Sequence, residues 1–357
     1  MKNLIKTESI CYDGNDIWFM QLEIPVLYRI NITSKINRKY MAPYDEILGC
    51  SYISIKYING KIWIIPEYAS RILVFDILNE KFDAIELFNG SVIEKKKINL
   101  FSGAEVNENE LICVPYNQSY LLRIDTNLKI LLEPLDFSKT IDCFIKPYTF
   151  TKVKENTYMA IAENFDGFIL YKAEKKEFRR ILVTIDTQNI DCFVSDGKYI
   201  YAYLKEDRML EKIDIYTGKI LSKVKTVTGG TIKIYFLWNK YIILSHILYY
   251  ENEIYDIDLN PKKTVYAAKD QTSKYYFGVW KEISAYEAIY YDSCSNCIYI
   301  FSKNELEISD YLIVDSNLSN DEWSNIHVDL LSKEGEVYGC TRFDLKKYIY
   351  YLINKGK

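Results

Sequence analysis

Residues 192–225 read CFVSDGKYIYAYLKEDRMLEKIDIYTGKILSKVK, and weaker copies of this stretch fill most of the chain. The segments SDGK at 195–198 and YTGK at 216–219 have the composition of tight turns, because glycine tolerates positive φ. The aromatic and branched residues of 199–204 are typical of a strand, and residues 210–215 end in the apolar–polar alternation of a half-buried strand. We therefore expect four antiparallel strands within about 40 residues, the last with charges that suit an edge.

The copies align on the apolar second strand, whose marker residues are Trp18, Trp63, Ile112, Met159, Tyr201, Ile242 and Tyr299. Their spacings are 45, 49, 47, 42, 41 and 57 residues. A third strand follows each time, from VLYRINI in the first copy to NELEISDYL in the last, and Asp76, Asp125, Asp214 and Asp258 recur near its end. A single sheet of this kind cannot bury both of its faces, so the copies must stack in a ring.

This pattern predicts an all-β fold, a seven-bladed β-propeller of four-stranded antiparallel blades. A six-bladed ring with an appendage is the alternative, because the seventh copy diverges most. We expect a propeller domain over residues 1–335 and a tail over 336–357 that packs on the ring or closes it. The tail fits a helix, with Leu345, Tyr348, Ile349, Leu352 and Ile353 on one face, but it also fits a strand. Either the tail or residues 2–6 would supply the outer strand of the last blade.

The last blade is expected to begin near Tyr286, after the longest insertion, QTSKYYFGVWKEISA at 271–285. Its fourth strand is placed at 326–331. The pair Cys294 and Cys297 then falls in the turn between its first two strands. This pair has no second pair to complete a zinc site and no helix N-terminus to lower a thiol pKa, so we interpret it as a turn.

Composition excludes several classes of function. The chain has 357 residues and a net charge of −4, so it lacks the basic surface expected of a nucleic-acid-binding protein. The sequence contains no run of about 18 apolar residues, so no membrane span is predicted. The N-terminal residues lack the apolar segment of a signal peptide, so none is expected. The scattered cysteines read as buried free thiols, and we expect a cytoplasmic protein. With two histidines and no phosphate loop or dinucleotide motif, no metal or cofactor is predicted.

The stretch GKYIYAY…LEKIDIYTGKIL resembles the YVTN-type repeat of bacterial propellers. It is also broadly similar to kelch, quinoprotein and virginiamycin-lyase propellers, whose blades share a turn glycine, an aromatic strand and a final Asp-x-x-Thr-Gly-Lys. Only the copy at 192–225 matches this pattern well, and the likeness covers the repeat alone. It implies a propeller and no particular function, since propellers host many activities. Members of the lyase branch use a His and Glu cluster, which we cannot map onto this sequence.

A ligand is expected on the face formed by the loops after each second strand and by the connections between blades. The position four residues past each marker should line the mouth of the central channel there: Leu22, Glu67, Tyr116, Glu163, Lys205, His246 and Lys303. The candidate binding residues on and beside this mouth are Tyr68, Arg71, Tyr116, Asn117, Asp166, Lys205 and Arg208. Ordinary polar loop surface is the alternative interpretation of the same residues.

Three residues are candidates for catalysis. Glu67 and Glu163 are a possible carboxylate pair of the glycosidase kind, and His246 is a possible base, although a histidine at a strand end is more often structural. The insertion adds Tyr276 and Trp280 as candidate binding residues, because exposed aromatic clusters mark interaction surfaces. An extra strand packed under the sixth blade is the other interpretation of this insertion.

These observations favour a non-catalytic propeller that binds a protein or peptide partner on its loop face. One alternative is a lyase or hydrolase that acts on a carbohydrate or peptide at the channel mouth, through Glu67, Glu163 and His246. Another is a sensor of glycans or small molecules that uses stacking tyrosines near Tyr68 and Tyr116. The sequence does not identify the ligand or the partner.

Overall fold

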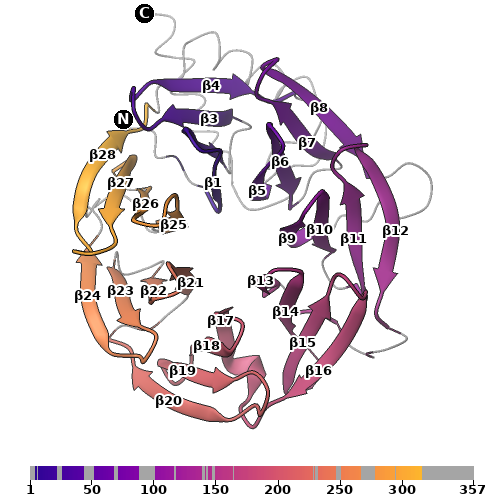
Figure 1. Ribbon diagram of the computed structural model, residues 1–357, viewed down its shortest axis with the longest axis vertical. Helices are drawn as coiled ribbons and strands as arrows, with labels where there is room; N and C mark the ends of the chain where they lie inside the picture. Colours follow the sequence, from indigo (N-terminus) through magenta and orange to yellow (C-terminus); the bar gives the residue numbers. More distant parts are fainter. Residues whose placement is uncertain are drawn as a thin grey trace, which may run out of the picture.

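The computed structural model describes residues 5, 7–21, 26–43, 52–67, 71–87, 101–115, 118–138, 141, 144–146, 149–163, 165–227, 229, 232–246, 251–266, 278–293 and 295–315. Within these residues, seven four-stranded antiparallel sheets form a closed ring (Figure 1). The predicted seven-bladed β-propeller is thereby confirmed. In every blade the four strands pair in the order in which they follow along the chain, from the innermost strand outward.

The strands are short, mostly of five to seven residues. The first three blades contain β1 (Ile10–Tyr12), β2 (Asp16–Met20), β3 (Val26–Asn31) and β4 (Asn37–Met41); β5 (Tyr52–Ile58), β6 (Lys61–Pro66), β7 (Arg71–Asp76) and β8 (Lys81–Glu86); β9 (Phe101–Asn107), β10 (Glu110–Pro115), β11 (Tyr120–Asp125) and β12 (Ile130–Asp136).

The remaining blades follow the same plan. Blade four contains β13 (Thr151–Lys154), β14 (Thr157–Ile161), β15 (Gly167–Lys172) and β16 (Glu177–Leu182), and the 3-10 turn η1 (Thr187–Asn189) precedes blade five. Blades five to seven contain β17 (Ile190–Ser195), β18 (Tyr199–Leu204), β19 (Met209–Asp214) and β20 (Ile220–Lys225); β21 (Ile232–Leu237), β22 (Tyr241–His246), β23 (Glu251–Asp256) and β24 (Pro261–Tyr266); β25 (Gly278–Glu282), β26 (Glu287–Asp292), β27 (Cys297–Ser302) and β28 (Ile308–Ile313).

The hydrophobic core is divided among the interfaces between blades. Each pair of neighbouring blades encloses its own cluster of buried apolar side chains, the first and last blades included. Because successive side chains of a strand point to opposite faces, each second strand contributes to two of these clusters. Trp18, for example, packs against blade two, whereas its neighbours Ile17 and Phe19 pack against blade seven. Stacking around the ring is therefore what buries both faces of every blade.

The structure corrects the repeat by one residue in blade six. Trp18, Trp63 and Tyr201 each face the following blade. In blade six the residue that does so is Ile243, which pairs with Ile254, whereas the predicted marker Ile242 faces blade five. A shift of one residue moves a strand's side chains to the opposite face, and the apolar run YIIL did not reveal which residue faces which blade.

Blade seven was assigned one strand too late. It begins with β25, inside the predicted insertion, and not near Tyr286. Its marker is Ile289 on β26, 46 residues after Ile243, whereas Tyr299 lies on the third strand. The segment NELEISDYL at 304–312, predicted as the third strand, overlaps the outer strand β28. The two cysteine positions, 294 and 297, come after the second strand of the blade and not after the first. The predicted outer strand at 326–331 and the tail at 336–357 lie outside the described residues.

Within the described residues blade seven has four strands of its own, with β28 outermost, and shares none with blade one. Most of residues 2–6 and the whole tail, one of which was predicted to supply the outer strand, lie outside the described residues. Contacts between side chains and backbone close the ring. Ile5 is buried in the cluster between these blades, where its amide donates to Asn296 Oδ1 (3.0 Å) and its carbonyl accepts from the Tyr291 hydroxyl (2.6 Å). Farther out, Lys35 pairs with Asp310 (2.9 Å) and Lys39 with Asp315 (2.8 Å).

Turn chemistry follows the sequence closely. The Asn-Gly pair at 59–60 is the sequence typical of a type I′ turn, and both residues have the positive φ that it requires, 48° and 76°. Gly218 has a φ of 68°, and a Cβ there would lie 2.3 Å from the Leu182 carbonyl oxygen, so the turn requires glycine. In blade six the residue that caps the turn is Asp256, not Asp258: its Oδ1 accepts from the amides of Asp258 and Asn260 (2.9 Å each).

Among the described residues, no helix has the length and apolar character needed to cross a membrane.

Candidate functional site

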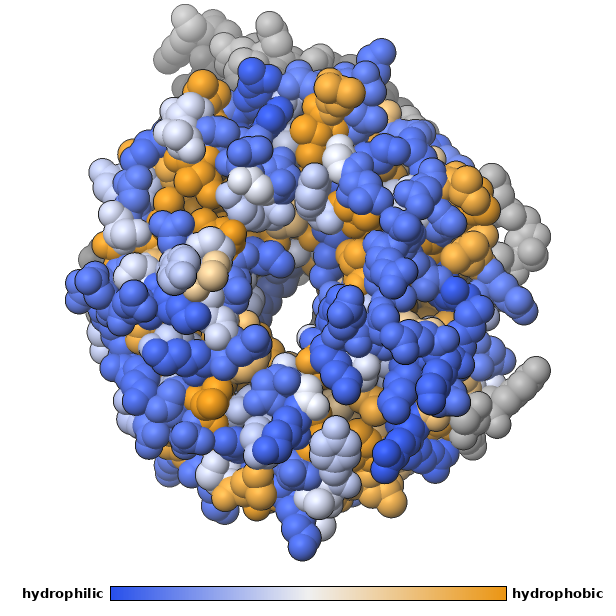
Figure 2. Space-filling model, in the orientation of Figure 1, coloured by the Kyte–Doolittle hydropathy of each residue, from blue (hydrophilic) through white to orange (hydrophobic). Residues whose placement is uncertain are grey.

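The face of the ring that carries the loops after each second strand also carries the connections between blades, because strands alternate in direction. We call it the mouth face. The innermost strands β1, β5, β9, β13, β17, β21 and β25 contact one another around the ring and surround a central channel. Figure 2 shows an opening at the centre of the molecule, with a largely hydrophilic rim. Polar groups near this opening are therefore accessible to a ligand.

Lys146 joins two blade connections on the mouth face. It lies in the connection between blades three and four, and its ammonium donates to the carbonyl oxygens of Gln188 (2.7 Å) and Ile190 (2.8 Å) in the next connection. Gln188 in turn donates to the carbonyl oxygen of Ala162 (3.0 Å), at the end of blade four's second strand. These bonds hold the backbone of the two connections and of the intervening loop together.

Charged side chains of both signs surround Lys146. Burial lowers the pKa of its ammonium, the carboxylates of Asp191, Asp186 and Glu163 oppose that shift, and the positive charge of Lys205 adds to it. Glu163 and Lys205 were predicted from two different blades to line the mouth, and the structure places both within electrostatic reach of Lys146. The Glu163 backbone amide is also fixed, by donation to the Phe144 carbonyl oxygen (3.0 Å).

Two exposed apolar side chains flank these charges. Phe144 is 43% exposed and Val227, in the connection to blade six, is 78% exposed. Arg208 is exposed in the loop after the second strand of blade five, and it lies so close to Gly229 in the connection to blade six that a Cβ on Gly229 would meet its Nε at 2.6 Å. We call the following set the mouth surface: Phe144, Lys146, Glu163, Asp186, Asp191, Lys205, Arg208 and Val227.

His246 does not line the channel mouth. It ends β22 and is fully buried, and its Nε2 lies 2.8 Å from Oε1 of Glu253 on the neighbouring strand. The reason is the one-residue shift in blade six, which makes His246 equivalent to buried residues such as Ala162 and Leu204 at the ends of other second strands. The residue four past the true marker is 247, outside the described residues. The prediction that His246 faces a ligand at the mouth is wrong.

The other predicted polar residues occupy separate places. Glu67 follows β6, and Arg71 begins β7, where its Nε pairs with Glu86 Oε1 (2.6 Å). Asp166 accepts, through Oδ1, from the Thr187 amide (3.4 Å), which ties the loop of blade four to η1. Lys303 follows a third strand rather than a second, so it lies on the opposite face from the mouth.

Trp280 is a core residue. It lies in β25 and is 4% exposed, its indole Nε1 donates to Asn252 Oδ1 (3.0 Å), and its ring stacks on Tyr290 at 4.6 Å. It therefore cannot form part of an exposed aromatic surface. Residues 278–282 do form a strand, but it is the innermost strand of blade seven and not an extra strand under blade six. The candidate binding residues Tyr68, Tyr116, Asn117 and Tyr276 lie outside the described residues.

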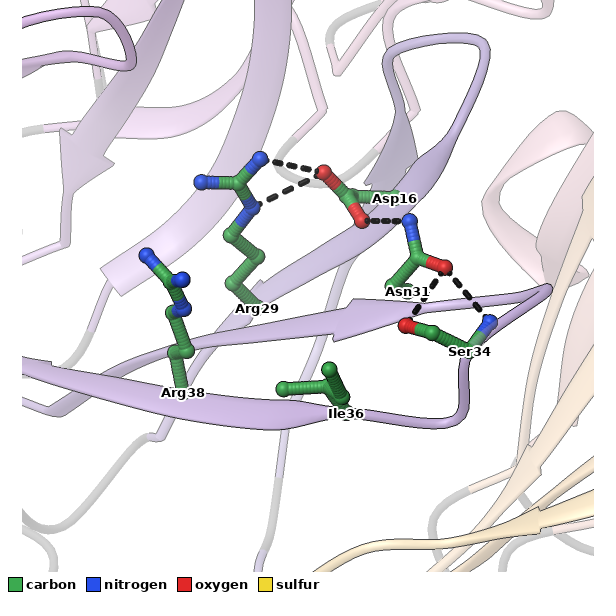
Figure 3. A pocket seen from close by; sticks show the side chains of 6 residues that line it. All are labelled: Asp16, Arg29, Asn31, Ser34, Ile36 and Arg38. Carbon is green, nitrogen blue, oxygen red and sulfur yellow. Dashed lines mark hydrogen bonds and ion pairs between the residues drawn. The ribbon is translucent and has the colours of Figure 1, made fainter.

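A shallow pocket of about 170 Å³ lies on blade one, at the face opposite to the mouth (Figure 3). Its polar groups bond to one another: Asp16 accepts from Arg29 Nε (2.8 Å) and Asn31 Nδ2 (2.7 Å), and Asn31 Oδ1 accepts from the amide of Ser34 (2.7 Å). Arg38 pairs with Glu80 (2.8 Å). These internal bonds identify the pocket as part of the blade's own turn structure.

Metal ligands do not gather in the part of the chain that the structure describes: no group of three or more His, Cys, Asp or Glu side chains is placed to hold an ion there.

Sequence reasoning missed Lys146, Asp186 and Asp191. All three lie in or beside connections between blades, which were expected on the mouth face. Charged residues within these connections are the signal that identifies them, because the connections lie on the same face as the loops after each second strand. The pair of His246 and Glu253 was also missed, because the strand ENEIYD at 251–256 contains three carboxylates and its sequence does not mark Glu253 as the buried one.

Comparisons with known proteins support the fold. No family model and no curated protein matches the chain. Among solved structures, the streptogramin B lyase structure is similar with a TM-score of 0.63 and 10% identity, over 82% of this chain and 93% of that chain. A catalytically inactive virginiamycin B lyase from Staphylococcus aureus, with quinupristin, has a TM-score of 0.62 and 10% identity, over 82% of this chain and 94% of that chain.

A third similar structure is Hsv2 from Kluyveromyces lactis, with a TM-score of 0.57 and 7% identity, over 87% of this chain and 99% of that chain. Identities this low establish a shared fold and nothing finer. The class defined by fold and comparisons together is the seven-bladed β-propeller. The narrower likeness to YVTN and kelch repeats stays a prediction.

Proposed function

We propose that this propeller is a non-catalytic binding module that engages a protein or peptide partner on its mouth surface. The observation that carries the proposal is the gathering of both charge signs, with the exposed ring of Phe144, over the two connections that Lys146 ties together, and of the exposed Val227 in the next connection along the chain. Aromatic and charged side chains on a positioned backbone supply an apolar contact and charge complementarity to one partner.

The extent of the surface favours a macromolecular partner. Its residues come from the connections before blades four, five and six, from the second-strand loops of blades four and five, and, for Asp191, from the start of β17. A small molecule would require convergent polar groups in a concave site, and the pocket on blade one lies on the opposite face. The arrangement therefore fits a peptide or protein segment laid across the connections.

The buried position of His246 argues against catalysis at the mouth by the predicted set. A general base must reach a proton on its substrate within hydrogen-bonding distance, and a fully buried imidazole bonded to Glu253 does not reach a ligand on the surface. The similarity to lyases is a similarity of fold and supplies no catalytic residue.

The test compares partner capture by three proteins: wild type, a mouth variant and a matched control. The mouth variant is Glu163→Lys with Lys205→Glu, which keeps the net charge and alters two exposed side chains. The control is Lys175→Glu with Glu177→Lys, also exposed, on the outer part of blade four. Folding is checked by circular dichroism, and partners from lysate of the source cell are then produced and titrated individually.

We expect a partner that wild type and control bind equally and that the mouth variant binds at least tenfold more weakly, which corresponds to about 1.4 kcal/mol. Equal affinity of all three proteins for every captured partner would contradict the assignment of this surface.

A further inference from the structure

The register of the innermost strands places seven residues at one level of the channel. These are the residues paired with the marker of each blade: Cys11, Lys56, Glu105, Thr151, Val194, Tyr235 and Lys281. We call them the channel ring. A residue directly opposite the marker points toward the same following blade as the marker does. Each member of the channel ring is therefore directed toward the next innermost strand.

Two of the three charges in the channel ring compensate each other. Lys56 on β5 is directed toward β9, where Glu105 lies at the same level, and the two side chains form an ion pair of 3.1 Å. Lys281 on β25 is directed toward β1, where the residue at the same level is Cys11. Burial raises the pKa of the Cys11 thiol to about 12, so this side chain is neutral at physiological pH and provides no countercharge.

Lys281 is therefore a cation without an ion-pair partner among the described residues. Its neighbour Glu282 points to the other face of β25, where its carboxylate accepts from the Trp238 amide (2.6 Å). Burial lowers the pKa of Lys281 most and the positive charge of Lys56 lowers it further, while interactions with Cys11, Glu105 and Glu282 oppose the shift. With two lysines and one glutamate, the channel ring has a net charge of +1.

Solvent reaches this lysine although protein surrounds it. The Lys281 side chain is exposed to solvent, although β25 is an innermost strand of the ring. The innermost strands surround the opening that Figure 2 shows at the centre of the molecule. Walls of low dielectric constant concentrate the field of charges of one sign in such a channel. Lys281 retains three ammonium donors, and Lys56 uses one of its own on Glu105.

We propose that the central channel holds a binding site for a small anion with carboxylate or phosphate oxygens at Lys281, with the positive charge of Lys56 at the same level of the channel as a second attraction. The anion supplies the countercharge that Cys11 does not supply at the level of the channel ring. The site is separate from the mouth surface and does not depend on the function proposed there.

The experiment titrates the full-length protein with inorganic phosphate, sodium acetate or sodium chloride at constant ionic strength, by isothermal titration calorimetry and by the melting temperature. The variants are Lys281→Met, Lys56→Met and, as a matched control, Lys175→Met, which removes an exposed positive charge from a turn of blade four. A general salt effect on stability appears equally in all four proteins, so only a difference between variants reports the site.

We expect phosphate or acetate to bind wild type and Lys175→Met alike, with at least tenfold weaker binding to Lys281→Met and a smaller loss for Lys56→Met. Preference for phosphate identifies a phosphate-type ligand, and preference for acetate identifies a carboxylate. Lys281→Gln, which keeps a polar end, is tested in the same way in case methionine disturbs the wall. Equal responses of wild type and both Lys281 variants to every anion would overturn the proposal.

Discussion

At the scale of single residues, the most constrained chemistry is the carboxylate of Glu253. It is buried, and it accepts hydrogen bonds from the Tyr255 hydroxyl and the Val227 amide (3.2 Å), with the His246 imidazole at 2.8 Å. Burial alone raises the pKa of Glu253, but the bonds from His246, Tyr255 and Val227 outweigh burial and hold it at about 2. This network joins β22 and β23 of blade six to Val227, in the connection between blades five and six.

Replacement of Glu253 by Gln should lower the free energy of unfolding at neutral pH by about 3 kcal/mol, because the amide NH2 that replaces one carboxylate oxygen cannot accept the hydrogen bonds that this buried carboxylate receives. The folded-state pKa lies below the unfolded value of 4.5, so the stabilisation is complete above pH 4.5 and is lost as the pH falls toward about 2. Urea denaturation of wild type and Glu253→Gln at a series of pH values measures the difference, which should narrow over that interval.

Glu211→Gln is the matched control. Glu211 is also buried, but burial raises its pKa. Its charged form is therefore disfavoured in the folded protein, so the variant should equal or exceed wild type in stability at neutral pH and converge with it in acid. The assignment to Glu253 fails if its variant shows a difference from wild type that does not change with pH.

At the scale of elements, an acidic side chain in the turn organises the first hairpin of blade one and of blade five. Asp196 Oδ1 accepts from the amides of Lys198 (2.8 Å) and Tyr199 (2.6 Å), and its Oδ2 accepts from the hydroxyl of the buried marker Tyr201 (3.0 Å). Asp13 makes the same arrangement in blade one, with its Oδ2 on the indole of Trp18 (2.8 Å). The turn and the core of the blade are therefore joined through one carboxylate.

Asp196→Ala should destabilise the protein by about 2 kcal/mol, because two turn amides lose their acceptor and a part-buried hydroxyl loses its partner. In a Tyr201→Phe background the same substitution should cost less, since no hydroxyl is left without an acceptor. Chemical denaturation of the four proteins in this double-mutant cycle measures the coupling. A coupling energy of zero would show that the bond to Tyr201 contributes nothing to stability.

At the scale of the whole molecule, the ring is held by packing between complete blades. All seven sheets consist of consecutive strands, and the seam between the last and first blades depends on a buried cluster and a few polar bonds. Asn296 is central to this seam: it is fully buried, its backbone has a φ of 52°, and its side chain accepts from the Ile5 amide.

Asn296→Gly should lower stability by about 1–2 kcal/mol through loss of side-chain hydrogen bonds, while glycine keeps the positive φ without strain. Asn296→Ala should cost about 1 kcal/mol more, because its Cβ disfavours that backbone conformation. Thermal denaturation of both variants provides the measurement. Equal stability of Asn296→Gly and wild type would show that the seam does not depend on this side chain.

Much of this architecture was predictable from local chemistry. Asn59 and Gly60 indicated their turn, and the markers Trp18, Trp63 and Tyr201 indicated buried second strands, because turn residues and apolar alternation are local properties. The position of a strand within its blade is not local, and EAIYYD at 287–292 reads equally well as any strand. Blade seven was assigned one strand late for this reason. The same limit applies to the site. The sequence repeat placed Glu163 and Lys205 on the mouth face, but it could not predict the bonds of Lys146, because they join residues more than 40 positions apart.

The consecutive order of strands within every blade also has a consequence for synthesis. Each sheet is complete as soon as its own segment has emerged from the ribosome, since no strand waits for a partner from a distant part of the chain. Local contacts of this kind form quickly, and domains generally fold from the N-terminus as they are made. The last step for this protein is then the meeting of two finished surfaces, blade seven against blade one, with Ile5 between them.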